Sequence, residues 1–166
     1  MLNFLKKVFN SKWNFKKPPK RRILIYDEHS KDLAYFIFSK SECNIMYVRY
    51  EEINFFVLFK TILKNGFINI RDIYKYNYTI TVDPEIIFTN FTFNYAFFKL
   101  KNKYSKALYI CILGSNTDIR FFKACDKYYQ KRNNEKLKAD LMFVPGKYCE
   151  NKFSKYIETK IFSIGS

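Results

Sequence analysis

The sequence contains few of the residues from which metal centres are built. In 166 residues it has one histidine, His29, and four cysteines, and no two cysteines form a C-x-x-C pair. A structural zinc site needs ligands at close local spacing. We therefore expect no metal, no cofactor and reduced, partly buried thiols, as is typical of a cytosolic protein. The cysteines are Cys43, Cys111, Cys125 and Cys149.

Long apolar runs and glycine-rich motifs are also missing. No apolar run approaches the roughly 20 residues that are needed to span a bilayer. The first residues lack the unbroken apolar core and the small-residue cleavage site of a signal peptide. The four glycines form neither a G-x-G-x-x-G fingerprint nor a P-loop. These absences argue against a membrane-spanning protein and against the common nucleotide-binding motifs.

Positive charge and aromatic residues, by contrast, are abundant. The chain carries 30 Lys and Arg against 15 Asp and Glu, a net charge of +15, together with 19 Phe and 14 Tyr. Such a balance favours a polyanionic partner, which can be nucleic acid, acidic lipid or a phosphate-bearing substrate. AT-rich codons encode Lys, Asn, Ile, Phe and Tyr, so genome composition is an alternative explanation for the charge outside the N-terminus.

The N-terminal residues 1–22 have the most one-sided charge, with eight cations and no anion. Apolar residues recur at helical spacing from Leu2 to Trp13, and Pro18-Pro19 then start an extended linker. This pattern predicts a basic amphipathic helix and a proline linker over residues 1–20, bound to an anionic membrane surface. A helix packed on the domain's own surface and a nucleic-acid-binding tail are the alternatives. The predicted membrane-binding residues are Lys6, Lys7, Lys12, Trp13, Lys16 and Lys17.

Residues 21–166 alternate short apolar runs with helical patterns. Because strands that are apolar on both faces must be covered on both sides, this alternation predicts an α/β fold with a single Rossmann-like parallel sheet and helices on both faces. Strands are expected at residues 23–26, 45–48, 86–89, 107–113, 141–144 and 161–163. Helices are expected at residues 31–39, 51–64, 69–82, 93–104, about 118–130 and 148–156, with an exposed polar segment at 131–138.

Polar residues follow the first four predicted strands, at the edge where such sheets bind ligands. We expect general acid or base groups after the first strand, because histidine titrates near neutral pH and carboxylates lie beside it. Later strand ends would hold a phosphate or sugar hydroxyls. The alternative is that these residues are ordinary loop polarity. The catalytic candidates are Asp27, Glu28 and His29, and the substrate-binding candidates are Arg49, Thr89, Asn90, Gly114, Ser115 and Asn116.

Four segments, taken in order, resemble the N-terminal domain of bacterial surface-carbohydrate biosynthesis transferases. The first is WNFKKPPKRRILIYD at residues 13–27, and the second is IMYVRYEEINFFVLFKTILKNG at residues 45–66. The second contains a variant of the family pattern Tyr-Val-Arg-Gly-Glu-x-Ile-Asn, which adds Glu51 and Asn54 to the substrate-binding candidates. The third and fourth are DPEIIFTNFTFNYAFFKLKNKY at residues 83–104 and the closing segment 138–166.

The resemblance implies a GT-B-like glycosyltransferase, in which two Rossmann-like domains face a cleft. The N-terminal domain of such enzymes contacts the acceptor, here a glycan or lipid-linked acceptor of capsule or lipopolysaccharide synthesis. The resemblance covers one domain alone, so we expect a truncated or split protein that is inactive by itself and pairs with a separate C-terminal donor-binding domain. The expected location is the cytoplasm, peripheral to the inner face of the cell membrane.

The sequence also departs from the family pattern. Tyr50 stands where the family has glycine, Thr92-Phe93 replace an Asp-Asn pair, and Ile112-Leu113 precede Gly114 where Gln-Asn is expected. Two other function classes therefore stay open. One is a basic nucleic-acid-binding module, which the absence of RNP and KH signatures makes the weaker alternative. The other is a membrane-attached scaffold without catalytic activity.

Overall fold

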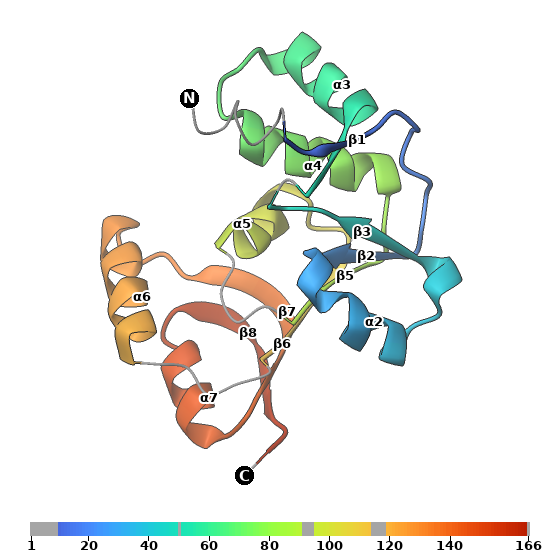
Figure 1. The fold of residues 1–166 in the computed structure, drawn as a ribbon. Helices are drawn as coiled ribbons and strands as arrows, with labels where there is room; N and C mark the ends of the chain where they lie inside the picture. Colours follow the sequence, from blue (N-terminus) through green and yellow to red (C-terminus); the bar gives the residue numbers. More distant parts are fainter. Residues whose placement is uncertain (1–9, 50, 91–94, 114–118, 166) are drawn as a thin grey trace. The chain divides into compact units, whose positions relative to one another are not determined.

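The computed structural model describes residues 10–49, 51–90, 95–113 and 119–165. These residues form an α/β fold with a six-stranded parallel sheet, in the order β3-β2-β5-β6-β7-β8, and a small sheet of β1 and β4 (Figure 1). The predicted Rossmann-like parallel sheet with helices is confirmed. The chain divides into two compact units, Met1–Ile87 and Phe88–Ser166, which we call unit 1 and unit 2.

Unit 1 is built around strand β2, whose four residues are completely buried. Strand β2 pairs in parallel with β3 in a register that runs from Ile23 opposite Cys43 to Tyr26 opposite Met46. The strands of unit 1 are β1 (Lys12–Asn14), β2 (Ile23–Tyr26), β3 (Cys43–Met46), β4 (Glu52–Asn54) and the start of β5 (Ile86–Thr89). Its helices are η1 (Glu28–Ser30), α2 (Lys31–Ile37), η2 (Lys40–Glu42), α3 (Phe55–Asn65) and α4 (Ile70–Val82).

Helices α3 and α4 lie side by side in unit 1 (Figure 1). The side chain of Asn54 begins α3, because its Oδ1 accepts a hydrogen bond from the amide of Val57 at 3.1 Å. Gly66 follows the last residue of α3 at φ 61°, a conformation that favours glycine. Between the helices, Asn77 Nδ2 donates to the hydroxyl of Thr61 at 2.9 Å, so the polar groups of this contact satisfy each other.

The small sheet of unit 1 corrects two predictions. Residues 52–54 form β4 and not the first turn of a helix, and β4 pairs in parallel with β1. Trp13 lies in β1 opposite Ile53, so the predicted N-terminal helix does not reach it. The rest of that predicted helix, residues 1–9, lies outside the described residues. A strand of three residues shows no period of its own, and pairing across the unit decided its conformation.

Unit 2 contains the rest of the parallel sheet. Its strands after β5 are β6 (Leu108–Ile112), β7 (Leu137–Val144) and β8 (Ile157–Ser163), and its helices are α5 (Tyr95–Lys103), α6 (Ile119–Lys131) and α7 (Lys147–Phe153). Helix α5 packs against β7, and α7 packs against β7 and β8 (Figure 1). Aromatic rings fill the core, with Phe97 against Tyr109 at 5.3 Å and Phe122 against Phe153 at 5.3 Å between ring centroids.

Strand β7 begins four residues earlier than the sequence predicted. Its first half contains the polar residues Lys138 and Asp140, which do not show the apolar run of a buried strand. The prediction treated residues 131–138 as an exposed polar segment, but the buried Leu137 starts β7 and pairs with Ile157. The register of β7 and β8 shifts between Lys138 and Leu141. Asp140 lies in this irregular stretch, where it accepts from Lys101 Nζ at 2.7 Å and from the amide of Tyr109 at 2.7 Å. These contacts make a carboxylate tolerable in a strand.

Burial separates the four cysteines into two groups. All four lie within the described residues as free thiols; Cys43 is half-buried and Cys111, Cys125 and Cys149 are buried. Burial raises the pKa of the Cys111 thiol to about 12. For Cys43, burial and then the neighbouring Glu42 carboxylate raise the thiol pKa. Among the described residues, no helix is both long enough and apolar enough to cross a membrane.

We predict that Cys43 is the first thiol to react with a maleimide in native buffer, because only the thiolate reacts and the other three are screened from the reagent. Because the pKa of Cys43 is raised, its rate should keep increasing with pH through the alkaline range. Mass spectrometry of peptides sampled over time measures each site. The denatured chain, in which all four thiols should react, is the control, and labelling of Cys111 as fast as Cys43 would contradict this burial.

Candidate functional site

The carboxylate of Asp27 lies at the carboxyl end of β2, where the sequence predicts a ligand-binding edge. Its side chain is almost completely buried, with 1 % of the residue exposed. Its backbone has φ 93° and ψ 131°, which non-glycine residues rarely adopt and which costs about 1–3 kcal/mol. The amide of Asp27 donates to the carbonyl of Met46, which ties the strained residue to β3. Backbone strain of this kind is concentrated at functional sites.

Two other predicted residues, His29 and Arg49, contact this carboxylate. Oδ1 of Asp27 accepts from the backbone amide of His29 at 3.1 Å and lies 3.2 Å from ring atom Nδ1 of the same residue. Oδ2 accepts from Nε of Arg49 at 3.1 Å. Nη1 of Arg49 lies 3.4 Å from Nε2 of His29, so each of the three side chains lies beside the other two. We call these three residues the Asp27 cluster.

The contacts of the Asp27 cluster determine the tautomer of His29. A carboxylate oxygen only accepts hydrogen bonds, so the ring nitrogen beside Asp27 must carry the proton. A guanidinium only donates, so Nε2 must present its lone pair to Arg49. Both contacts fit a Nδ1–H tautomer whose Nε2 lone pair points toward the guanidinium of Arg49. The His29 and Arg49 side chains are 58 % and 40 % exposed, so both reach solvent while Asp27 anchors them from below.

The other predicted residues of unit 1 lie outside the cluster. Glu28 lies 3.8 Å from Lys31 in a surface ion pair. Glu51 is exposed just before β4, and its carbonyl accepts from the amide of Lys12. Asn54 is buried and caps α3, and its Nδ2 donates to the carbonyl of Lys16 at 2.7 Å. The contacts of Asn54 are structural, because both polar atoms of its side chain hold the backbone.

The remaining substrate-binding candidates lie in unit 2 or outside the described residues. Thr89 ends β5 as a buried residue of unit 2, and Asn90 follows it. Gly114, Ser115 and Asn116 lie outside the described residues, as do Lys6 and Lys7. Of the other predicted membrane-binding residues, Lys12 lies 3.9 Å from Glu52 and Trp13 packs against Phe55. Lys16 and Lys17 are exposed after β1.

A hollow of about 480 Å³ lies on unit 1 and was not predicted from the sequence. Its volume is in the range of small-ligand sites. Phenol, amide, ammonium and carboxylate groups line it, and they come from β1 and the linker after it, α2, β3 and the loop after it, β4 and α4. They include Asn14, Lys16, Tyr35, Asn44, Tyr47 and Tyr78. The sequence analysis singled out Lys16 only as a membrane-binding residue and did not identify the others, because each of them has the character of an ordinary surface or core position.

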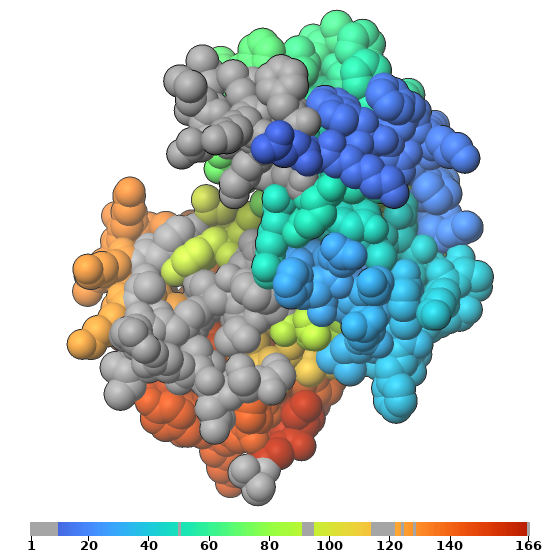
Figure 2. Space-filling model, in the orientation of Figure 1, coloured from blue at the N-terminus to red at the C-terminus, as the bar shows by residue number. Residues whose placement is uncertain are grey.

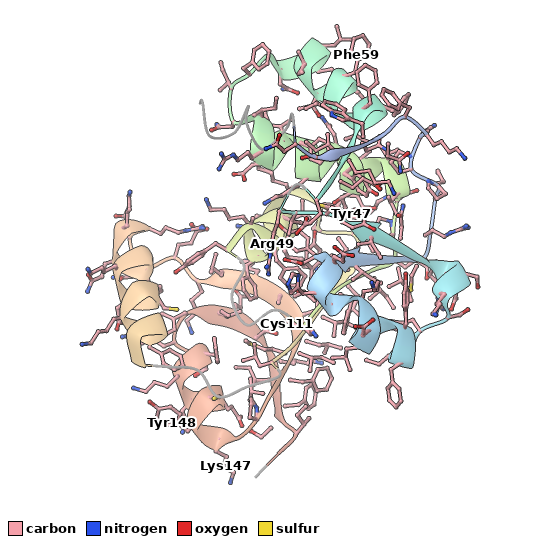
Figure 3. The ribbon with its side chains drawn as sticks, viewed as in Figure 1. Tyr47, Arg49, Phe59, Cys111, Lys147 and Tyr148 are labelled. Atoms are coloured by element: carbon pink, nitrogen blue, oxygen red, sulfur yellow. The ribbon has the colours of Figure 1, made fainter. Side chains whose placement is uncertain are left out.

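Two tyrosines of the hollow, Tyr47 and Tyr78, have phenol pKa values raised above the ordinary value. Burial raises the pKa of the Tyr47 phenol, and the carboxylates of Glu52 and Glu28 add to the shift. Burial also raises the pKa of Tyr78, whose hydroxyl donates to the carbonyl of Ile45 at 3.0 Å. Tyr47 and Arg49 leave the chain two residues apart, just after β3 (Figure 3). One loop therefore contributes to both the hollow and the Asp27 cluster.

The described residues contain no group of three or more His, Cys, Asp or Glu side chains that could hold a metal ion. No family model, curated protein or solved structure matches the chain. The likeness to surface-carbohydrate transferases stays a prediction, carried by the residues named above. The chemistry of the site therefore has to be argued from its own side chains, which offer an oriented imidazole, a cation and neutral phenols.

We predict that His29 is a Nδ1–H tautomer in mildly alkaline buffer. Long-range ¹⁵N–¹H correlation spectra distinguish the two ring nitrogens, and the chain has a single histidine, so assignment is direct. In Asp27→Asn the amide replaces an oxygen that only accepts, and the tautomer should shift toward Nε2–H, the usual preference of free imidazole. Glu28→Gln, which removes the ion pair with Lys31 and none of the contacts of the Asp27 cluster, should leave the spectrum unchanged. A Nε2–H tautomer in the unsubstituted protein would contradict the geometry of the Asp27 cluster.

We also predict that Asn54→Ala lowers the free energy of unfolding by about 1–2 kcal/mol, because the N-cap of α3 is lost. Urea unfolding followed by circular dichroism measures the change. Asn65→Ala at the exposed opposite end of α3 is the matched control and should change stability by less than about 0.5 kcal/mol. Equal stability of Asn54→Ala and the unsubstituted protein would mean that the cap contributes nothing.

Proposed function

We propose that this chain is the acceptor-side domain of a glycosyltransferase that builds a surface polysaccharide, such as capsule or lipopolysaccharide. The observation that carries the proposal is the Asp27 cluster, which joins an oriented imidazole to a solvent-reaching guanidinium at the carboxyl end of a buried parallel strand. An acceptor hydroxyl has to lose a proton when it attacks a sugar donor. A phosphate on a lipid-linked acceptor has to be held while it does so.

Within this proposal the three residues have separate roles. Arg49 binds the acceptor phosphate, because a guanidinium matches two phosphate oxygens at once. His29 accepts the proton of the attacking hydroxyl at Nε2, and Asp27 orients the ring and stabilises the imidazolium that forms. The contact of 3.4 Å between Arg49 and Nε2 is long for a hydrogen bond. A phosphate that draws the guanidinium outward would leave Nε2 facing the acceptor.

The hollow of unit 1 supports a carbohydrate as the bound group. Sugars present hydroxyls around their rim and carbon-bound hydrogens on their faces. Amide groups such as those of Asn14 and Asn44 can exchange hydrogen bonds with hydroxyls, and the rings of Tyr35 and Tyr47 offer flat apolar surfaces. The phenol of Tyr47, kept protonated by its raised pKa, adds a donor.

We propose that the chain does not turn over alone. The donor-binding half would come from a separate C-terminal-type domain, and the complex would work at the cytoplasmic face of the cell membrane. The arrangement is supported by the four segments that resemble the N-terminal domain of surface-carbohydrate transferases. The basic leader predicted at residues 1–20 is consistent with an anionic membrane surface.

Phosphate recognition is tested by NMR titration of the full chain with sugar 1-phosphates and with inorganic phosphate, observed at the ring signals of His29. We expect saturable shifts that require both phosphate and sugar for full affinity. Arg49→Met should weaken binding by about ten-fold, as expected for one lost charge-assisted hydrogen bond. Arg22→Met, which removes a surface guanidinium paired with Glu42, is the matched control and should leave the affinity unchanged.

Two results would count against the proposal. Absence of any His29 shift at saturating sugar phosphate would remove the acceptor role of the Asp27 cluster. Sugar transfer by the purified chain from nucleotide-sugar donors, with no second protein present, would contradict the split arrangement while leaving the site itself intact. The two parts of the proposal are thereby tested separately.

A further inference from the structure

Within the described residues, helix α3 has one buried side and one side that carries exposed apolar residues. Val57, Leu58 and Thr61 are buried, and Thr61 makes the hydrogen bond to α4. The opposite side carries Phe56, Phe59 and Leu63 at spacings of three and four residues, so they form one stripe. Phe59 is 53 % exposed and Leu63 is 70 % exposed. Phe59 lies on the outer side of α3 in Figure 3.

The apolar stripe continues beyond both ends of the helix. At its start, Phe55 packs between Phe15 and Phe59, with ring centroids 5.2 and 5.9 Å away. After Gly66, the consecutive residues Phe67 and Ile68 project from the connection to α4, and Ile68 is 76 % exposed. Figure 2 shows the segment after residue 9 in blue beside the green of α3. We call the set the α3 face: Phe15, Phe55, Phe56, Phe59, Leu63, Phe67 and Ile68.

The charged residues within the two segments that form the α3 face, 15–17 and 55–68, are all positive. Lys60 and Lys64 lie along one flank of the helix, and Lys16 and Lys17 follow Phe15. The ammonium of Lys17 lies 5.8 Å from the ring centroid of Phe56, at the border between charge and apolar surface. Neither residues 15–17 nor residues 55–68 contain a carboxylate. The surface thus combines a ridge of large apolar side chains with flanking cations.

We propose that the α3 face binds the surface of a bilayer that contains anionic lipids. The phenylalanine, leucine and isoleucine side chains would enter the boundary between headgroups and acyl chains, and the lysines would contact lipid phosphates. Monomeric soluble proteins rarely leave so many large apolar groups exposed in one patch without a partner. This inference does not depend on the proposed transferase activity, and it assigns membrane contact to folded surface in addition to the predicted leader.

The composition of the α3 face favours a bilayer over two other occupants. In a two-fold dimer of this chain the same patch faces itself, so the four lysines would approach each other without a carboxylate between them. A single-stranded nucleic acid would stack its bases on aromatic rings. The two side chains of the face that are most exposed, Ile68 and Leu63, are aliphatic and offer no such platform. A lipid surface accommodates aromatic and aliphatic groups alike.

The proposal is tested by co-sedimentation of the full chain with vesicles of phosphatidylcholine and phosphatidylglycerol in equal parts, and with phosphatidylcholine vesicles. We expect binding to the anionic vesicles. The triple variant Phe59→Ser, Leu63→Ser and Ile68→Ser should bind them at least about ten-fold more weakly, because three inserted apolar side chains are lost. Phe36→Ser is the matched control, since Phe36 is 88 % exposed on α2, away from the α3 face, and should leave binding unchanged.

Insertion is measured directly with one tryptophan. Phe67→Trp in a Trp13→Phe background leaves a single indole at the predicted contact point. Lipids with brominated acyl chains should quench its fluorescence, and the emission should move to shorter wavelength. Adding Lys6→Glu and Lys7→Glu to this background removes two positive charges from the leader and leaves the α3 face unchanged. If the α3 face inserts by itself, brominated lipid should still quench the single indole.

Three outcomes would overturn the proposal. The first is a triple variant that binds anionic vesicles as well as the unsubstituted chain. The second is sedimentation with vesicles but no quenching by brominated lipid, which would mean that the leader or charge alone holds the protein. The third is that another partner occupies the α3 face. This would be a dimer that forms without lipid and that the triple variant abolishes, as measured by sedimentation velocity. It would equally be salt-dependent oligonucleotide binding that the triple variant abolishes while vesicle binding persists. Either result would assign the α3 face to a second copy of the chain or to nucleic acid.

Discussion

The complete burial of strand β2 is the constraint on which the rest of unit 1 depends. Its four side chains are apolar or aromatic and none reaches solvent, so other elements have to cover both faces of the strand. Parallel strands are joined by crossover connections, and the helices in these connections cover the faces of the sheet. The carboxyl ends of parallel strands lie at the same edge of the sheet. At the end of β2 the chain changes from apolar to polar residues within one residue. Asp27 stands at that turn.

The same constraint explains why a carboxylate is buried there. The side chain of Asp27 is buried, and its oxygens are satisfied by the turn that follows and by Arg49 from the next loop. Removal from water disfavours a charge unless it is paired and hydrogen-bonded, and this one is both. The strained backbone at φ 93° is tolerated because these contacts over-determine the position. Structural necessity and a chemically useful arrangement coincide in one residue.

Helix α3 illustrates the opposite relation between fold and surface. Its inner side has all the contacts that the fold needs, including the paired polar groups of Thr61 and Asn77. Its outer side carries large apolar residues that contribute little to packing within the described structure and expose apolar area to water. The inner side of α3 thus packs within the fold, whereas its outer side stays exposed. The connection through Gly66 extends the outer side to Phe67 and Ile68.

Long periodic segments were predictable, and short or polar ones were not. Strand β2 and helix α4 follow the predicted bounds closely, because four consecutive apolar residues and a full helical period are strong local signals. Strands β1 and β4 escaped prediction, since three residues show no period. Strand β7 was predicted too short because Asp140 reads as a loop residue until Lys101 and the Tyr109 amide are placed beside it.

The sequence by itself determined the class of the fold and the candidate side chains, since hydrophobic pattern controls which segments are strands and where polar residues interrupt them. It also indicated that Asp27, His29 and Arg49 would follow neighbouring strands. Tertiary structure alone decided that these three meet within 3.4 Å or less and that Glu28 and Asn54 turn elsewhere. It alone decided which side of α3 stays exposed. Distances between residues far apart in the chain depend on how whole elements pack, and no local pattern encodes them.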